Sequence, residues 1–337
     1  MTYSDWHSIQ LSQLKTVSLQ SVELRKALAA CYSYHREIGF ISDDLLQSVT
    51  TYTQIPLPDT PFHFHLQFNP ERARRGRSDR VHPSPQHSID FQGGIPCFCC
   101  PDVIQYQWPE ERGFEKTIRE TSLIFLPNPS PIFSDHFTIV SAEHRDQVID
   151  IPLVIETAVE AVGYWVVEND RQVGATNPWH FHLQAFLSDD LPIIQFPSHP
   201  IPVSEHADFL LLRLQLPTPV FEFRFDPSDT AAIEKITTHC RQYVDSDPNH
   251  RLTVLCRVSA DACSLFVSLR DIRHRSSMYP VGQPGYAEVA GVISVISQDR
   301  FLEWSRRGAP LFNQILSEIA PDEAVVCQWL HGLAPLS

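Results

Sequence analysis

The segment His180-Phe181-His182-Leu183-Gln184 carries the residue types best suited to covalent chemistry. On a β-strand alternate side chains point to the same side, so His180, His182 and Gln184 form one polar row. Such a row suits an electrophile with anionic oxygens, because one imidazole can attack phosphorus while the other orients it or joins a metal site. The amide can donate to a phosphoryl oxygen. The alternative is a solvated strand face with incidental histidines.

A second chemical feature is the tetrapeptide Cys97-Phe98-Cys99-Cys100, which holds three of the eight cysteines. In a cytosolic protein of this size such a cluster indicates metal binding or reactivity before it indicates a disulfide. The alternative is a small buried thiol cluster. The other five cysteines lie among apolar neighbours and are expected to be small core residues.

Composition and charge limit the class of partner. The net charge is −14 and the pI is about 5.5, which argues against a nucleic-acid partner but not against a single nucleotide. No run of about 18 apolar residues exists, so no membrane span is expected. The first ten residues lack a basic segment followed by an apolar one, which favours a cytoplasmic protein over a secreted one.

The elements expected to position these residues are antiparallel strands and amphipathic helices, which together indicate an α+β fold. A proline-rich stretch at 190–208 suggests a boundary that divides the chain into residues 1–195 and 196–337. Expected helices lie within 7–50 and at 152–168, 228–244 and 309–320. Expected strands lie at 62–69, within 121–141, before 187, and at 209–216, 220–225, 251–259, 263–272 and 291–297.

The pentapeptide HFHLQ occurs twice, at 63–67 and at 180–184. No similarity extends beyond the two copies, so they do not mark a periodic repeat. A turn of small residues, GATNP, precedes the second copy, whereas FNPER follows the first. We therefore assign the covalent chemistry to the second copy.

The segment GATNPWHFHLQ, residues 174–184, resembles the active-site segment of galactose-1-phosphate uridylyltransferase, a member of the histidine-triad superfamily. It is also similar to that of the diadenosine tetraphosphate and GDP-hexose phosphorylases. Those families carry a Gly-x-Ser turn followed by His-x-His-x-Gln. Here Thr176 replaces the serine and Trp179 is an apparent insertion. Weaker likeness extends over roughly residues 60–305, through segments at 68–75, 97–102 and 128–148 and in the C-terminal half.

The resemblance implies two histidine-triad-like halves, each an antiparallel sheet with packed helices, and a covalent mechanism in the first half. His182 would attack the α-phosphorus, with His180 beside it, and Gln184 would hydrogen-bond the nucleotidyl phosphate. Substrate and phosphate binding would involve Gly174, Thr176, Asn177, Asn69, Arg72, Arg273 and His274. The expected enzyme is a nucleotidyltransferase or phosphorylase that acts on a nucleoside diphosphate sugar, with a sugar 1-phosphate or inorganic phosphate as acceptor.

The resemblance also implies a structural zinc ion. The uridylyltransferases hold zinc with two cysteines and two histidines, and the matching positions are Cys97, Cys100, His144 and His180. Two cysteines with two histidines suit tetrahedral zinc. Homodimers are common among these families, so a homodimer is a further expectation.

Other functions compete with this hypothesis. A dinucleoside polyphosphate phosphorylase or hydrolase would use the same chemistry and differ only in what fills the sugar pocket. A non-catalytic nucleotide-binding protein would keep the fold without the covalent step. A metal-dependent hydrolase is disfavoured, because the sequence contains no H-E-x-x-H segment or obvious set of carboxylate ligands.

Overall fold

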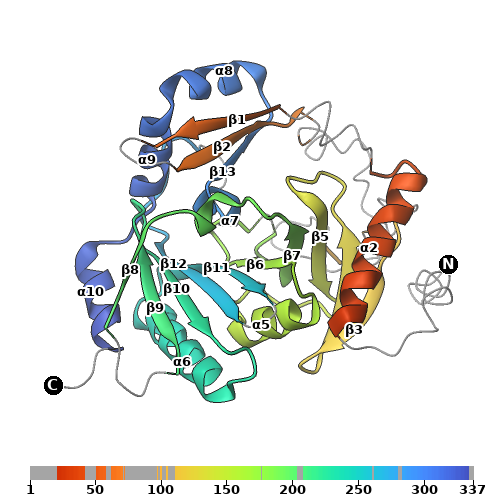
Figure 1. Cartoon of the computed structure of the whole chain (residues 1–337), viewed down its shortest axis with the longest axis horizontal. Coiled ribbons are helices and arrows are strands. Elements are labelled where there is room, and N and C mark those ends of the chain that lie inside the picture. The colour runs from red at the N-terminus through yellow and green to blue at the C-terminus, as the bar shows by residue number, and fades with distance from the viewer. Residues whose placement is uncertain are drawn as a thin grey trace.

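The computed structural model contains a large antiparallel sheet with packed helices, which confirms the α+β prediction (Figure 1). The structure describes residues 21–41, 51–57, 62–70, 72, 97, 99–100, 104, 111–175, 177–202, 208–259, 262–279 and 283–333. Within these residues no helix combines the length and the apolar character needed to cross a membrane.

Ten strands form the main sheet, and every pairing in it is antiparallel. The series β4-β5-α5-β6-β7 recurs later as β9-β10-α6-β11-β12, and the pairing of β6 with β11 joins the two series. In spatial order the strands are β3 (Phe114–Ile118), β4 (Thr121–Pro127), β5 (Ser134–Ser141), β7 (His182–Leu187), β6 (Trp165–Asn169), β11 (His250–Val258), β12 (Cys263–Asp271), β10 (Val220–Phe225), β9 (Leu210–Leu214) and β8 (Ser198–Pro200).

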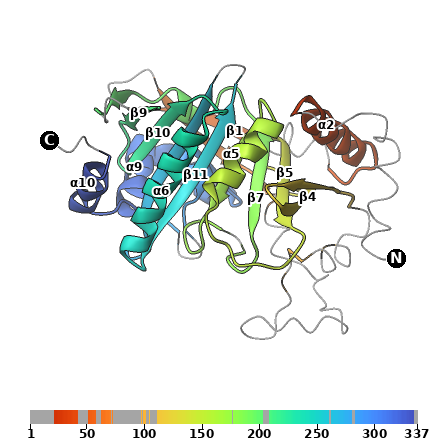
Figure 2. The same cartoon turned by 90° about the horizontal axis from the view of Figure 1, so that it is seen from below.

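One face of this sheet is covered by α2 (Ser21–Glu37), α5 (Ile151–Glu160), α6 (Thr230–Ser246) and α10 (Glu323–His331) (Figure 2). Apolar side chains from these helices share one buried core with alternate residues of the strands. Asp150 and Asp229 cap the N-termini of α5 and α6, where their side chains accept backbone N–H groups at 3.1 and 3.0 Å.

The opposite face carries a small three-stranded sheet, in the order β1 (Thr51–Pro56), β2 (His63–Phe68) and β13 (Val292–Val295). The pairing of β2 with β13 is parallel and joins segments from both sides of the expected boundary at 195. A second apolar core packs around this sheet. It includes residues of η2 (Pro192–Ile194), α7 (Tyr286–Val289), α8 (Gln298–Arg307) and α9 (Ala309–Glu318).

The expected helix at 152–168 is wrong beyond Glu160. Gly163 has φ +91°, a backbone conformation that favours glycine and ends helical continuity. Residues 165–169 then form β6 in the middle of the sheet, where Val166 and Val167 are buried. The valines pack against both cores, which outweighs the apparent helical spacing.

Candidate functional site

The polar row of the second HFHLQ copy lies at the start of β7, on the face that carries the small sheet. His182 stands opposite Val140 of β5, and Gln184 stands opposite Thr138. Phe181 and Leu183 point to the other face and belong to the helix-side core. The alternation expected from the sequence therefore sorts the polar and apolar residues onto two faces.

Hydrogen bonds fix the tautomer of His182. Its Nδ1 lies 2.9 Å from the carbonyl oxygen of His180, which only accepts, so Nδ1 carries the proton and Nε2 carries the lone pair. The backbone N–H of His182 donates to Oε1 of Gln147 at 2.8 Å. Gln147 in turn donates to the buried Glu168 at 2.9 Å. Burial raises the pKa of Glu168 well above its usual value.

Gln184 is held by its amide oxygen. That oxygen accepts from the hydroxyl of Tyr286 at 2.7 Å and from Nε2 of His136 at 2.7 Å. His136 donates through Nε2 because its Nδ1 accepts the backbone N–H of Ile132 at 3.0 Å. With the oxygen so occupied, the side chain of Gln184 presents its amide nitrogen as a donor.

The four expected metal ligands come together. The ligand atoms of Cys97, Cys100, His144 and His180 all lie within 4.8 Å of one another. Nδ1 of His180 is 3.4 Å from the sulfur of Cys97 and 3.6 Å from that of Cys100. Nδ1 of His144 is 3.4 Å from the Cys100 sulfur. Cys99, which is also buried, does not belong to this group.

The chemistry of this cluster fits a tetrahedral metal ion. Bonds of the usual zinc lengths would place sulfur and nitrogen ligands about 3.6 Å apart, close to the distances found. Nε2 of His180 donates to the carbonyl of Ser141 at 2.9 Å, so its Nδ1 faces the sulfurs without a proton. Hydrogen bonds from Cys100, His180 and Asn177 lower the pKa of Cys97 against the effect of burial, which favours the thiolate that binds metal. These residues can hold a metal ion.

The turn before His180 differs from the expectation in detail. Gly174 has φ +106°, and a Cβ there would lie 2.3 Å from the Cα of Gly285, so contact between backbones accounts for this glycine. The side chain of Asn177 donates to the sulfur of Cys97 at 3.0 Å, which places it at the metal cluster. Thr176 lies outside the described residues. Phosphate binding by these three residues stays a prediction.

Asn69 and Arg72 connect the end of β2 to the turn before β5. Asn69 is buried and donates to the carbonyl of Pro131 at 3.0 Å. Arg72 donates to the carbonyl of Ser130 at 2.9 Å. The charge of Arg72 also acts on Glu288 of α7. The structure thus brings this pair near α7, and phosphate binding by it stays a prediction.

Arg273 and His274 follow β12 and already have protein partners. The guanidinium of Arg273 is paired with Asp271 and lies 3.2 Å from Asp247. Nδ1 of His274 contacts the carbonyl of Ala320. Neither residue belongs to the hydrogen-bonded group around Gln184, so their predicted contact with phosphate is untested.

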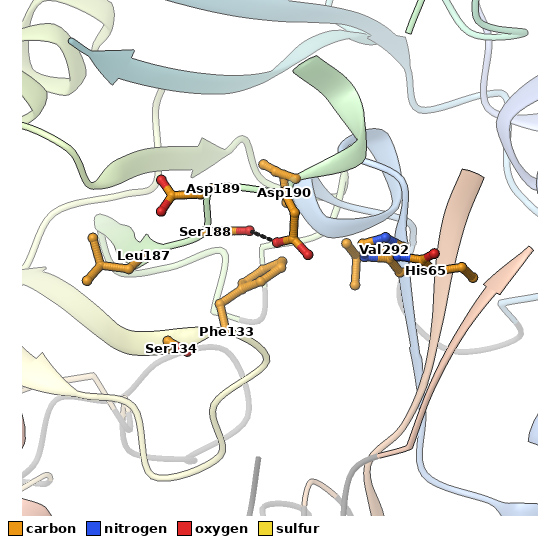
Figure 3. Close-up of a pocket in the computed structure, with 10 residues that line it drawn as sticks. His65, Phe133, Ser134, Leu187, Ser188, Asp189, Asp190 and Val292 are labelled. Atoms are coloured by element: carbon orange, nitrogen blue, oxygen red, sulfur yellow. Dashed lines mark hydrogen bonds between the residues drawn. The ribbon is translucent and has the colours of Figure 1, made fainter. Parts of the chain in front are cut away.

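A cavity of about 550 Å³ lies between the small sheet and the far end of β7 (Figure 3). Its wall includes His65 of β2, Phe133 before β5, and residues 187–191 after β7. Phe133 stacks on Phe186 with ring centroids 4.0 Å apart and lies 6.1 Å from the ring of His136. Neither His182 nor Gln184 is among the described residues that line the cavity, which is connected to Gln184 only through the packing of Phe133 near His136. No Lys or Arg is among its described lining residues.

Several supporting residues were missed by the sequence reasoning. Gln147 and Glu168 are separated from His182 by 35 and 14 residues, and no local pattern marks them. Tyr286 lies in the later segment that contributed to the resemblance, but nothing in that segment connects its hydroxyl to Gln184. These residues are found only once the strands are assembled.

The comparisons with known proteins support the fold. A sequence model of a domain of unknown function, DUF4922, matches residues 44–187. No curated protein matches the chain by sequence. Crystal structures of yeast Ap4A phosphorylase Apa2, alone and with Ap4A, superimpose with TM-scores of 0.56 and 0.57, at 15% and 14% identity. Each match covers 88% of this chain, and 94% or 97% of the yeast chain. At this identity the likeness shows the fold: the chain has the architecture of yeast Apa2.

Proposed function

We propose that the protein transfers a nucleoside monophosphate group through a covalent nucleotidyl-histidine at His182. The observation that carries this proposal is the hydrogen bond of His182 Nδ1 to the His180 carbonyl, because it puts the lone pair on Nε2. A positioned lone pair of this kind is what nucleophilic catalysis by histidine requires. The likeness of the fold to that of a phosphorylase adds support by analogy.

The reaction has two displacement steps at one phosphorus atom. In the first, Nε2 of His182 attacks the α-phosphorus, the N–P bond forms, and the bond to the bridging oxygen breaks. The leaving phosphate keeps that electron pair. In the second, an oxygen of inorganic phosphate attacks the same phosphorus, and the N–P bond breaks with its electrons returning to Nε2. The amide nitrogen of Gln184 donates to a phosphoryl oxygen in both steps.

A dinucleoside polyphosphate is the first candidate donor. The structures that resemble this chain include yeast Ap4A phosphorylase with Ap4A and with AMP, the latter at 16% identity and a TM-score of 0.56. A fold does not fix a substrate. The likeness in fold therefore supports the proposed reaction class more strongly than it supports this donor.

A nucleoside diphosphate sugar is the second candidate, and the cavity at the far end of β7 favours it. The carboxylate of Asp190, the hydroxyl of Ser188 and the imidazole of His65 border the cavity (Figure 3). The carboxylate of Asp189 is paired with Arg257. The bordering groups hydrogen-bond hydroxyl groups well, and the carboxylate of Asp190 disfavours phosphate there. A sugar fits this chemistry better than a chain of phosphates does.

We also propose that the metal cluster holds a structural zinc ion. Cys97, Cys100, His144 and His180 would be its ligands. Bound zinc would fix the 97–100 segment against the start of β7 and so orient the backbone of His180, whose carbonyl holds His182. No step of the transfer passes through the metal.

The proposal is tested by incubating the protein with donors labelled at the α-phosphate, without an acceptor. The panel contains dinucleoside tetraphosphates and nucleoside diphosphate sugars. We expect acid-labile label on the wild type and on His63→Ala, a histidine-to-alanine control in the first HFHLQ copy, but none on His182→Ala. The donor that labels fastest names the substrate class. Absence of label from every donor, on folded and metal-loaded protein, would refute the covalent mechanism.

A further inference from the structure

Two cross-strand pairs on β11 and β12 place polar side chains on the same face as the candidate site. Arg251 is opposite Arg270, and Thr253 is opposite Ser268. The residues between them point to the helix-side core, so these four share the face that carries the small sheet. Thr253 is also opposite Asn169 at the end of β6. The polar patch therefore lies two to three strands from β7, in the C-terminal series of strands.

These side chains are buried, yet several of their polar atoms lack partners. The exposed fraction is 0% for Thr253, Ser268 and Arg270 and 9% for Arg251. Among the described residues, nothing hydrogen-bonds the two hydroxyls, Nε and Nη2 of Arg270, or Nε of Arg251. The nearest carboxylate oxygen recorded for Arg251 Nε, on Asp170, is 3.9 Å away. Buried polar atoms without partners are costly and rare, which points to a missing ligand.

The chemistry of the unpaired atoms selects an oxyanion. A guanidinium group only donates hydrogen bonds, and the two hydroxyls can also donate. Burial lowers the pKa of Arg270 to about 10, so the group stays cationic at neutral pH. Glu288 attracts Arg270 electrostatically, but no hydrogen bond joins them in the described structure. Phosphate oxygens match this set of donors, because arginine binds them with charge-assisted hydrogen bonds.

One short segment connects this patch to Gln184. The carbonyl of Pro284 accepts from Nη1 of Arg270 at 2.9 Å. The backbone N–H of Tyr286 donates to Oδ1 of Asn169 at 2.9 Å, and its hydroxyl donates to Gln184 at 2.7 Å. Arg270 and Gln184 thus hold the two ends of one three-residue segment. Phosphoryl groups next to an α-phosphorus at Gln184 would lie toward Arg270.

We propose that Arg251, Thr253, Ser268 and Arg270 form a second phosphate site, which binds a phosphoryl group that is not transferred to His182. Its part in the reaction, as the site for the leaving or accepting phosphate, rests on the proposed function. Its affinity for phosphate does not, since no covalent step is needed to bind the ion.

The test measures binding of inorganic phosphate to the full chain by calorimetry, in the His182→Ala background. The double variant Thr253→Val, Ser268→Ala removes only the two hydroxyls and keeps side-chain volume nearly constant. We expect it to weaken phosphate binding about tenfold or more, the usual effect of losing a hydrogen bond to a charged group. Arg270→Lys should weaken binding at least as much. Arg213→Gln, which removes a surface ion pair with Glu323, is the control and should not weaken it.

Two outcomes of the calorimetry would overturn the inference. In the first, phosphate does not bind at millimolar concentration, which means that the wild-type patch fills with water only. In the second, phosphate binds at the polar row, so that Gln184→Ala weakens binding while the double hydroxyl variant does not. Loss of phosphate affinity in all variants together with lower thermal stability would show misfolding of the variants. Tungstate located by anomalous scattering in crystals of the His182→Ala protein then replaces the calorimetry. Tungstate at Arg270 supports the site, and tungstate elsewhere refutes it.

Discussion

The same five residues, HFHLQ, occupy two strands of this protein and meet different neighbours. The first copy, 63–67, lies within β2, and the second copy, 180–184, leads into β7, which begins at His182. Both strands bury the Phe and Leu on one face, since Phe64, Leu66 and Leu183 are 0% exposed and Phe181 is 1% exposed. The polar row on the other face is equally well formed in both. Alternation alone therefore does not make a site.

The two glutamines show what differs. Both ends of Gln67 are occupied, because its nitrogen donates to the carbonyl of Ile132 at 2.9 Å and its oxygen accepts from Ser294 at 2.8 Å. Among the described residues, the hydrogen bonds of the Gln184 side chain all go to its oxygen, which leaves its nitrogen as a donor. Gln67 thus joins two segments of the chain, whereas Gln184 is oriented to meet a ligand.

The largest expected difference between the copies lies between the proposed nucleophile, His182, and the first histidine of the other copy, His63. His182→Ala should lower nucleotidyl transfer by about 10³-fold or more, because loss of a nucleophile leaves only binding and electrostatic contributions. His63→Ala should leave the rate near that of the wild type. Steady-state kcat on the best donor measures both. An equal loss of kcat in the two variants would show that the two HFHLQ copies do not differ in catalysis.

The next effect concerns metal and stability. Cys100→Ser should remove bound zinc, measured by elemental analysis, and lower the apparent Tm by roughly 5–10 °C, since metal binding contributes directly to folding. His63→Ala should retain both the metal and the Tm. A Cys100→Ser protein with unchanged metal content would show that the four residues are not the ligands.

The two glutamines should differ most in kcat. Gln184→Ala should reduce kcat by about 10²-fold, as loss of one oriented transition-state donor does. It should also lower the free energy of unfolding, because it leaves the buried donors of Tyr286 and His136 without their acceptor. Gln67→Ala should leave kcat unchanged but lower the free energy of unfolding by about 1–3 kcal/mol, because it leaves buried partners unsatisfied. Steady-state kinetics and denaturant titration on both variants measure kcat and the free energy of unfolding. Similar kcat values for the two variants would contradict the assignment of Gln184 as the phosphoryl donor.

The smallest effect is a pH dependence at His65. Burial lowers the pKa of His65 from its ordinary value near 6.5, although Asp190 opposes the shift. The unfolded chain therefore binds a proton more readily than the folded one as pH falls below about 6.5, and stability decreases there. His65→Gln should remove part of the fall in Tm between pH 6.5 and 5. An unchanged Tm profile would show that His65 titrates normally.

Much of the fold could be predicted from local pattern, because strands such as 220–225 and helices such as 228–244 carry their periodicity within a few residues. The pairing of β2 with β13 could not, since it joins residues more than two hundred positions apart. The helix expected at 152–168 failed where tertiary packing of Val166 and Val167 outweighed spacing.

The residues of the candidate site also fall into those that the sequence predicted and those that only the assembled fold reveals. The second HFHLQ copy was selected by its preceding turn, and the ligand set of Cys97, Cys100, His144 and His180 came from resemblance. The partners that orient these residues, Gln147 and Tyr286, have no signal in sequence. Arg270 lies near the end of a strand that also contains Ser264, Ser268 and Asp271, and its burial appears only in the assembled sheet.

The most direct test of the central claim is the position of the phosphorus on the histidine ring. Protein trapped with a donor in the absence of acceptor is digested, and ³¹P NMR with mass spectrometry locates the N–P bond. The hydrogen bond of Nδ1 to the His180 carbonyl predicts attachment at Nε2 of His182. Attachment at Nδ1, or at a histidine of the first copy, would contradict the account.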